Sequence, residues 1–155
     1  MPKIDLAERV IANIALYPKE RVLLAESNVK MIFRGGIRRY PRGPPELSTK
    51  LEGWTIKPNG VLFLTNKRII FAIEGRKFLL LRASEVLFEA PLSRIYSVGI
   101  AEGEIRELVI SLETGTWRKD KFYFSVKDPD SWIKSINALL FREKKEKDNK
   151  HAISR

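Results

Sequence analysis

The sequence contains no cysteine and only one histidine. Without cysteine, the chain has no disulfide, no thiol nucleophile and no thiolate ligand for a metal. The single histidine, His151, falls in a polar C-terminal segment where neither a general base nor a metal ligand would be held rigidly. We therefore expect no metal site, no cofactor and no histidine-based catalysis.

Long hydrophobic runs are also missing. No apolar stretch approaches the ~18 residues that are needed to span a bilayer. The first residues carry charges, and they are not followed by the apolar segment that a signal peptide has. This pattern predicts neither a signal peptide nor a transmembrane helix. The expected location is the cytoplasm, including the periphery of its membranes.

A catalytic constellation is not apparent in the sequence. It lacks a Walker-type phosphate loop, and Glu102 and Glu104 flank a glycine in an expected turn, where both carboxylates face water. We therefore expect a protein that is not an enzyme.

Positive charge is what the sequence has in excess. Its 29 lysines and arginines outnumber 19 acidic residues and give a formal net charge of +10. Such an excess favours a polyanionic partner, such as an anionic membrane or a nucleic acid. The alternative explanation is an ion-pair-rich surface of a heat-stable protein, which would need no such partner.

Hydrophobic periodicity predicts an amphipathic helix at each end of the chain. Apolar residues recur every three or four positions from Ile4 to Leu16, and Tyr17-Pro18 ends this pattern. Near the other end, Asp128-Pro129 is a typical helix start that precedes an apolar stripe beginning at Trp132. The expected organisation is an N-terminal helix that packs on the domain (1–20), the domain itself (21–141) and a charged tail (142–155).

Between the helices, apolar residues mostly alternate with a period of two, as in antiparallel strands with one buried face. We expect two strands within 21–33, meeting at Ser27-Asn28, and then a long loop at 34–59. One hairpin should turn at Asn66-Lys67 and a second at 82–85. Three further strands are expected at 95–101, 108–112 and 122–126.

These elements predict a mainly β fold: an antiparallel barrel or sandwich capped by a C-terminal helix, with an extra N-terminal helix. Four apolar side chains from different segments should share its core, namely Phe71, Ile110, Phe124 and Trp132.

One segment carries a family resemblance. The run Gly60-Val61-Leu62-Phe63-Leu64-Thr65-Asn66-Lys67-Arg68-Ile69-Ile70-Phe71 resembles the central hairpin of GRAM and bacterial pleckstrin-homology-like domains. Ala90-Pro91-Leu92-Ser93-Arg94-Ile95 is similar to the next landmark of that family, and the Trp132 helix follows where such domains place the helix that plugs their barrel. The resemblance covers residues 21–141 and implies a pleckstrin-homology-like barrel. This superfold binds phosphoinositides, proteins or neither, so function must be argued from a site.

The candidate binding site is a basic loop. Seven basic and two acidic residues between Lys30 and Lys57 account for half of the net charge. The resemblance implies that the loop between the first two strands supplies basic residues for lipid phosphates, as it commonly does in pleckstrin-homology domains. Arginine can bind a phosphate with two hydrogen bonds. Hairpin turns on the same rim would add further cations. The candidate ligand-binding residues are Lys30, Arg34, Arg38, Arg39, Arg42, Lys67, Arg68, Arg76 and Lys77.

The sequence leaves the partner open. The first expectation is an acidic lipid surface or an acidic protein. The alternative is RNA, because Arg34 to Gly43 resembles a short arginine-glycine segment in which Tyr40 could stack on a base. A third reading is a scaffold that binds protein through an apolar groove and independently of charge, with the basic segment a solvated loop.

Overall fold

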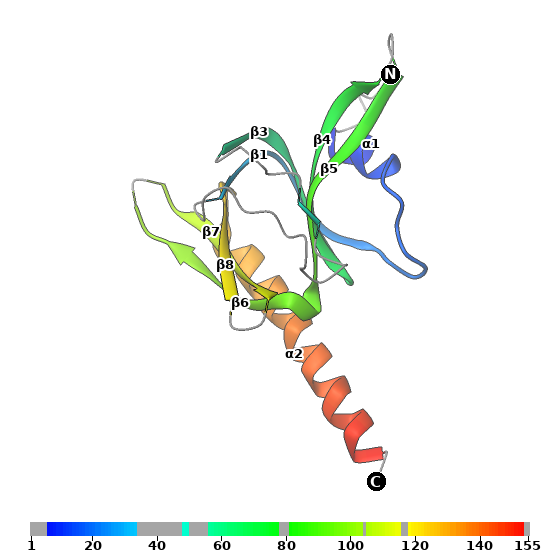
Figure 1. Ribbon diagram of the computed structural model, residues 1–155, viewed down its shortest axis with the longest axis vertical. Coiled ribbons are helices and arrows are strands. Elements are labelled where there is room, and N and C mark those ends of the chain that lie inside the picture. The colour runs from blue at the N-terminus through cyan, green and yellow to red at the C-terminus, as the bar shows by residue number, and fades with distance from the viewer. Residues whose placement is uncertain are drawn as a thin grey trace.

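The computed structural model describes residues 6–33, 48–49, 56–77, 81–103, 105–115 and 118–153. In this part of the chain, eight strands form one antiparallel sheet in the order β2-β5-β4-β3-β1-β8-β7-β6 (Figure 1). The strands are β1 (Val22–Phe33), β2 (Ser48–Thr49), β3 (Ile56–Thr65), β4 (Arg68–Lys77), β5 (Leu81–Pro91), β6 (Ile95–Ala101), β7 (Glu107–Gly115) and β8 (Arg118–Phe124). The helices are α1 (Leu6–Ala12), the 3₁₀ turn η1 (Leu92–Arg94) and α2 (Pro129–Ile153).

Strand β1 joins the two halves of the sheet. It pairs with β3 along its length, and its last residues, Met31 to Phe33, also pair with β8. The prediction of two strands meeting at Ser27-Asn28 is wrong, because β1 is continuous. Those two residues instead mark a register shift between Glu26 and Val29, where Asn28 has a φ of 58°. Asparagine tolerates this left-handed conformation, so the strand bends without ending.

The second hairpin also differs from expectation. Residues 82–85 belong to β5 and pair with β4, so the connection between these strands falls between Lys77 and Leu81. Beyond Ala72, β4 pairs with β5 and no longer with β3, and the two strands project as a ribbon (Figure 1). Strand pairing therefore overrides the polar composition of 82–85. Strand β3 likewise begins at Ile56, inside the stretch predicted as loop.

The main core lies between the two halves of the sheet and α2. Phe71, Ile110, Phe124 and Trp132 all belong to one buried cluster, as predicted. The helix begins where expected: the Ser131 N–H donates to Asp128 Oδ1 at 3.3 Å, a capping contact. The prediction of a mainly antiparallel β fold with a C-terminal helix and an extra N-terminal helix is confirmed.

A second apolar cluster lies on the opposite face of β3 and β4. There α1 packs Ala7 and Val10 against four sheet residues, namely Val61, Phe63, Ile70 and Ala72. Burial on both faces explains why these two strands are almost continuously apolar. The helix ends at Ala12 rather than Leu16, so the residues that follow it form an irregular linker up to β1.

Gly60 lies where two backbone segments come close together. A Cβ atom built on it would lie 2.7 Å from the Ala72 carbonyl oxygen and 2.7 Å from Cζ of Phe71. A side chain at this position would therefore push β3 away from β4.

Candidate functional site

The predicted basic residues do not converge on one rim among the described residues. Lys67 is exposed in the β3–β4 turn, whereas Arg76 and Lys77 lie at the far end of β4. Arg68 and Lys77 are nine positions apart in an extended strand, which corresponds to about 30 Å. Lys30 is exposed on the second half of β1, where its N–H donates to Ser125 Oγ at 2.8 Å. The other four candidates, Arg34, Arg38, Arg39 and Arg42, lie outside the described residues.

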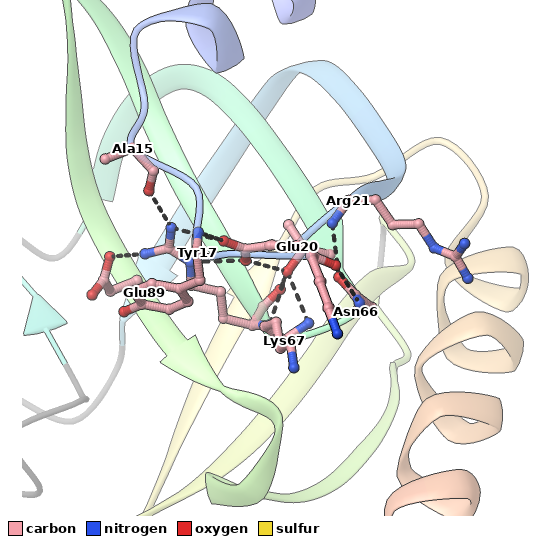
Figure 2. Close-up of polar contacts among 10 residues, drawn as sticks. Ala15, Tyr17, Glu20, Arg21, Asn66, Lys67 and Glu89 are labelled. Carbon is pink, nitrogen blue, oxygen red and sulfur yellow. Dashed lines mark hydrogen bonds and ion pairs between the residues drawn. The ribbon is translucent and has the colours of Figure 1, made fainter.

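Arg68 does not fit the expected role of an exposed ligand-binding residue. Only 6% of it is exposed, and its guanidinium forms ion pairs with Glu20 at 3.0 Å and Glu89 at 2.9 Å (Figure 2). It also donates to the Ala15 carbonyl oxygen at 2.7 Å and lies 4.3 Å from the ring centroid of Tyr17. These internal contacts occupy the guanidinium, so we assign Arg68 a structural role.

Glu20 is the centre of this polar cluster. Its side chain is fully buried, and its carboxylate accepts hydrogen bonds from Thr65 Oγ1 at 2.6 Å and from the Tyr17 N–H at 2.9 Å. Arg68 adds two more, from Nε at 3.0 Å and Nη2 at 3.2 Å. A buried carboxylate is tolerated only with such partners. We call Glu20, Thr65, Arg68 and Glu89 the polar clamp.

Asn66 extends the clamp to the rest of the linker. Its Oδ1 accepts from the Arg21 N–H at 2.8 Å, and its Nδ2 donates to the Lys19 carbonyl oxygen at 3.1 Å (Figure 2). The β3–β4 turn therefore holds the linker at several successive backbone groups.

The clamp keeps both of its central charges. Burial alone would raise the pKa of Glu20, but the hydrogen bonds from Arg68, Thr65 and the Tyr17 N–H, with the charge of Arg68, hold that pKa below its ordinary value of 4.5. Burial alone would lower the pKa of Arg68, but the hydrogen bond and charge of Glu20, with the charge of Glu89, raise it. Neither group titrates near neutral pH, so the cluster anchors the chain and does not exchange protons.

One sequence signal could have identified Arg68 as buried. Along β4 it alternates in phase with Ile70 and Ala72, the residues that α1 covers. Reading Arg68 as part of an exposed turn overlooks this phase. The partner Glu20 carries no comparable signal, because its position depends on how the linker folds back.

A shallow pocket of about 300 Å³ lies on β6, β7 and β8. A Cβ atom added to Gly99 would have no other heavy atom within 4 Å apart from its chain neighbours, so the space over this glycine is open. Among the described residues that line the pocket, Lys121 is the only charged one. The lining residues are Ser97, Val98, Gly99, Ile100, Ala101, Val109, Ser111, Lys121 and Tyr123. This mixed lining differs from the apolar groove that a charge-independent scaffold would use.

The described ranges, 6–33, 48–49, 56–77, 81–103, 105–115 and 118–153, hold neither a metal-binding cluster nor a membrane-spanning helix. Within them, no cluster of three or more His, Cys, Asp or Glu side chains is placed to hold a metal ion. No helix in the same ranges combines the length and the apolar character required to cross a bilayer. Comparison with known proteins gave no matching family model and no matching curated protein.

Proposed function

We propose that this protein is a non-enzymatic binding module of the pleckstrin-homology-like or GRAM-like kind. Its basic segment between β1 and β3 binds an anionic partner, either the acidic headgroups of a membrane or an acidic protein surface. The observation that carries this proposal is the pairing of Ile32 with Ile56. This pair makes 34–55 the connection between the first two long strands, which is where the resemblance implies a ligand-binding loop.

The strand order gives further support. Two antiparallel groups, β1-β3-β4-β5 and β6-β7-β8, are joined through β1, and α2 follows the last strand. This agrees with the helix-capped barrel that the resemblance implies. The fold alone does not select a ligand, so the charge of the segment carries the choice of an anionic partner.

The test compares the parent protein with an Arg38/Arg39/Arg42→Ala variant on phosphatidylcholine vesicles with and without phosphatidylserine. The parent should bind only the acidic vesicles and should bind them more weakly as salt is added. Each basic residue near such a surface changes the partition coefficient by about fivefold, so the variant should lose roughly 100-fold. A Lys121/Lys127/Lys134→Gln variant, which removes three exposed cations from the described surface, is the matched control.

Other outcomes identify other partners. Binding to a polyglutamate peptide but not to acidic vesicles, lost in the arginine variant, identifies an acidic protein as the partner. Binding to mixed RNA without lipid, weakened by Tyr40→Ala, supports the RNA alternative. If the parent binds none of these polyanions at low salt, the proposal is wrong, and the pocket on β6 to β8 becomes the surface to investigate.

A further inference from the structure

Exposed apolar side chains concentrate in the linker and in the first residues of β1. Leu16 is 39% exposed, Tyr17 52% and Leu23 40%. These are three of the six large hydrophobic residues that are exposed in the described part of the chain, and they fall within eight positions. The other three are Tyr96, Ile105 and Phe141. Single exposed apolar residues need no explanation, but a cluster of them indicates an interaction surface.

The exposed charges at this surface are all positive. Lys19, Arg21 and Lys67 are exposed, and Asn66 ties the backbones of the linker and the turn together. The nearby acids are occupied internally: Glu20 is buried, and Glu89 pairs with Arg68. We call Leu16, Tyr17, Lys19, Arg21, Leu23 and Lys67 the linker tip; Figure 2 shows its Tyr17, Arg21 and Lys67 around the clamp.

Lys19 adopts an uncommon backbone conformation within the linker tip. Its φ is 64°, in the left-handed region that glycine or asparagine occupies at lower cost. Its carbonyl oxygen accepts from Asn66 Nδ2, and the next N–H, of Glu20, donates to the Tyr17 carbonyl oxygen at 3.0 Å. These bonds therefore fix the tight turn from Tyr17 to Glu20 at the centre of the linker tip.

We propose that the linker tip is a membrane-docking surface. Leu16 and Tyr17 insert among the headgroups of an acidic bilayer, and Lys19, Arg21 and Lys67 bind the lipid phosphates and carboxylates. Interleaved apolar and cationic side chains without an exposed acid match such an interface, where tyrosine is favoured. The surface does not include the basic segment 34–42, so this inference goes beyond the proposed function.

A membrane fits this surface better than a nucleic acid does. Binding to single-stranded RNA would need an open aromatic face on which a base could stack. One face of the Tyr17 ring is already covered by the Arg68 guanidinium, 4.3 Å from the ring centroid. Aliphatic Leu16 and Leu23 offer no stacking surface either, whereas both gain from transfer to an apolar environment.

The first test measures insertion directly. Because the chain has no cysteine, L16C introduces a single site for an environment-sensitive fluorophore such as NBD. Its emission should shift to the blue on phosphatidylserine-containing vesicles and stay unchanged on pure phosphatidylcholine. F141C is the matched control, since Phe141 is 69% exposed on α2, an element that contributes no residue to the linker tip. No shift at L16C while the protein sediments with the vesicles would overturn the inference.

The second test removes the charges. A Lys19→Gly/Arg21→Gln/Lys67→Gln variant should bind acidic vesicles roughly 100-fold more weakly than the parent, about fivefold for each cation. Lys19→Gly also relieves the left-handed conformation, so loss of folding would not explain the result. The Lys121/Lys127/Lys134→Gln control should bind within a few-fold of the parent.

The two proposals can fail separately. If the linker tip docks, L16C fluorescence should still shift when Arg38, Arg39 and Arg42 are replaced by alanine. If the basic segment alone binds lipid, that shift disappears and the charge variant of the linker tip binds like the parent, which contradicts the inference. Absence of any binding by the parent to acidic vesicles contradicts the inference as well, while binding of an acidic peptide would still support the proposed function.

Discussion

Replacing Arg68 by methionine should destabilise the fold strongly, because it leaves the Glu20 carboxylate buried without its ionic partner. The Glu20 side chain is fully buried and would keep only the bonds from Thr65 and the Tyr17 N–H. Removing one member of a buried ion pair costs about 3–5 kcal/mol in the free energy of unfolding. For a chain of 155 residues this corresponds to a fall in Tm of roughly 6–20 °C.

A double-mutant cycle isolates the ionic contribution. Glu20→Gln keeps an acceptor for Thr65 and leaves Arg68 paired with Glu89, so it should cost less, about 1–3 kcal/mol. The Glu20→Gln/Arg68→Met protein should then be more stable than the sum of the single changes predicts, by about 0.5–3 kcal/mol. Urea denaturation followed by far-UV circular dichroism measures all four proteins. Additive effects, or an Arg68→Met protein within 1 kcal/mol of the parent on the scale of ordinary surface changes, would refute the reasoning.

The same cycle has a pH dependence whose sign follows from Glu20. Its folded-state pKa lies below the ordinary value of 4.5, so between the two values the unfolded state binds more protons and stability rises with pH. The contribution of Glu20 is therefore fully present above about pH 5 and is lost as the pH falls through the folded-state pKa. Glu20→Gln should flatten the stability profile in that acidic window. A profile as steep as that of the parent would assign the acid sensitivity to other carboxylates.

Three further changes test the packing. Trp132→Ala should cost about 3–5 kcal/mol in urea denaturation, because this side chain is 3% exposed in the main core; a Tm unchanged from the parent would show that α2 does not pack as described. Gly60→Ala should cost about 1–3 kcal/mol through its close contacts, whereas Gly99→Ala, with open space around it, should fall within about 0.5 kcal/mol of the parent; equal costs would contradict the geometry at Gly60. Truncation after Phe141 should leave a cooperative thermal transition, because the sequence that follows is mostly charged and surface ion pairs contribute little; a non-cooperative melt would assign a packing role to the end of α2.

The strands that were predicted well are those with strict alternation. Ile95–Ala101 has its expected bounds, and the segment 108–112 lies within β7. The strand expected at 122–126 forms the end of β8, which stops at Phe124, two residues earlier than predicted. A one-residue slip there would expose the whole core face, so the pattern defines the strand. The errors at Ser27-Asn28 and at 82–85 have one cause. Polar residues in the sequence predict turns there, but hydrogen bonds to neighbouring strands keep these residues within β1 and β5.

The candidate site was harder to predict, because it depends on contacts between distant segments. The turn at Asn66-Lys67 was found from local chemistry, and Lys67 is exposed as expected. The apolar periodicity predicts a first helix that reaches Leu16, whereas α1 ends at Ala12 and a linker with exposed apolar residues follows it. Glu20 and Arg68 are separated by 48 positions. Their pairing follows only once α1 and the β3–β4 turn are placed together.

The polar clamp and the exposed linker tip are two consequences of one arrangement. A segment whose apolar side chains point to solvent cannot be held in place by burying them, so its position has to come from hydrogen bonds. Asn66 and Arg68 supply these bonds, at the Ala15 and Lys19 carbonyl oxygens and the Arg21 N–H. A buried ion pair is often no more stable than an apolar replacement, and its attested advantage is a defined geometry. Here that geometry keeps Leu16 and Tyr17 exposed in a linker that also carries the exposed cations Lys19 and Arg21, which suits the proposed docking on an acidic membrane.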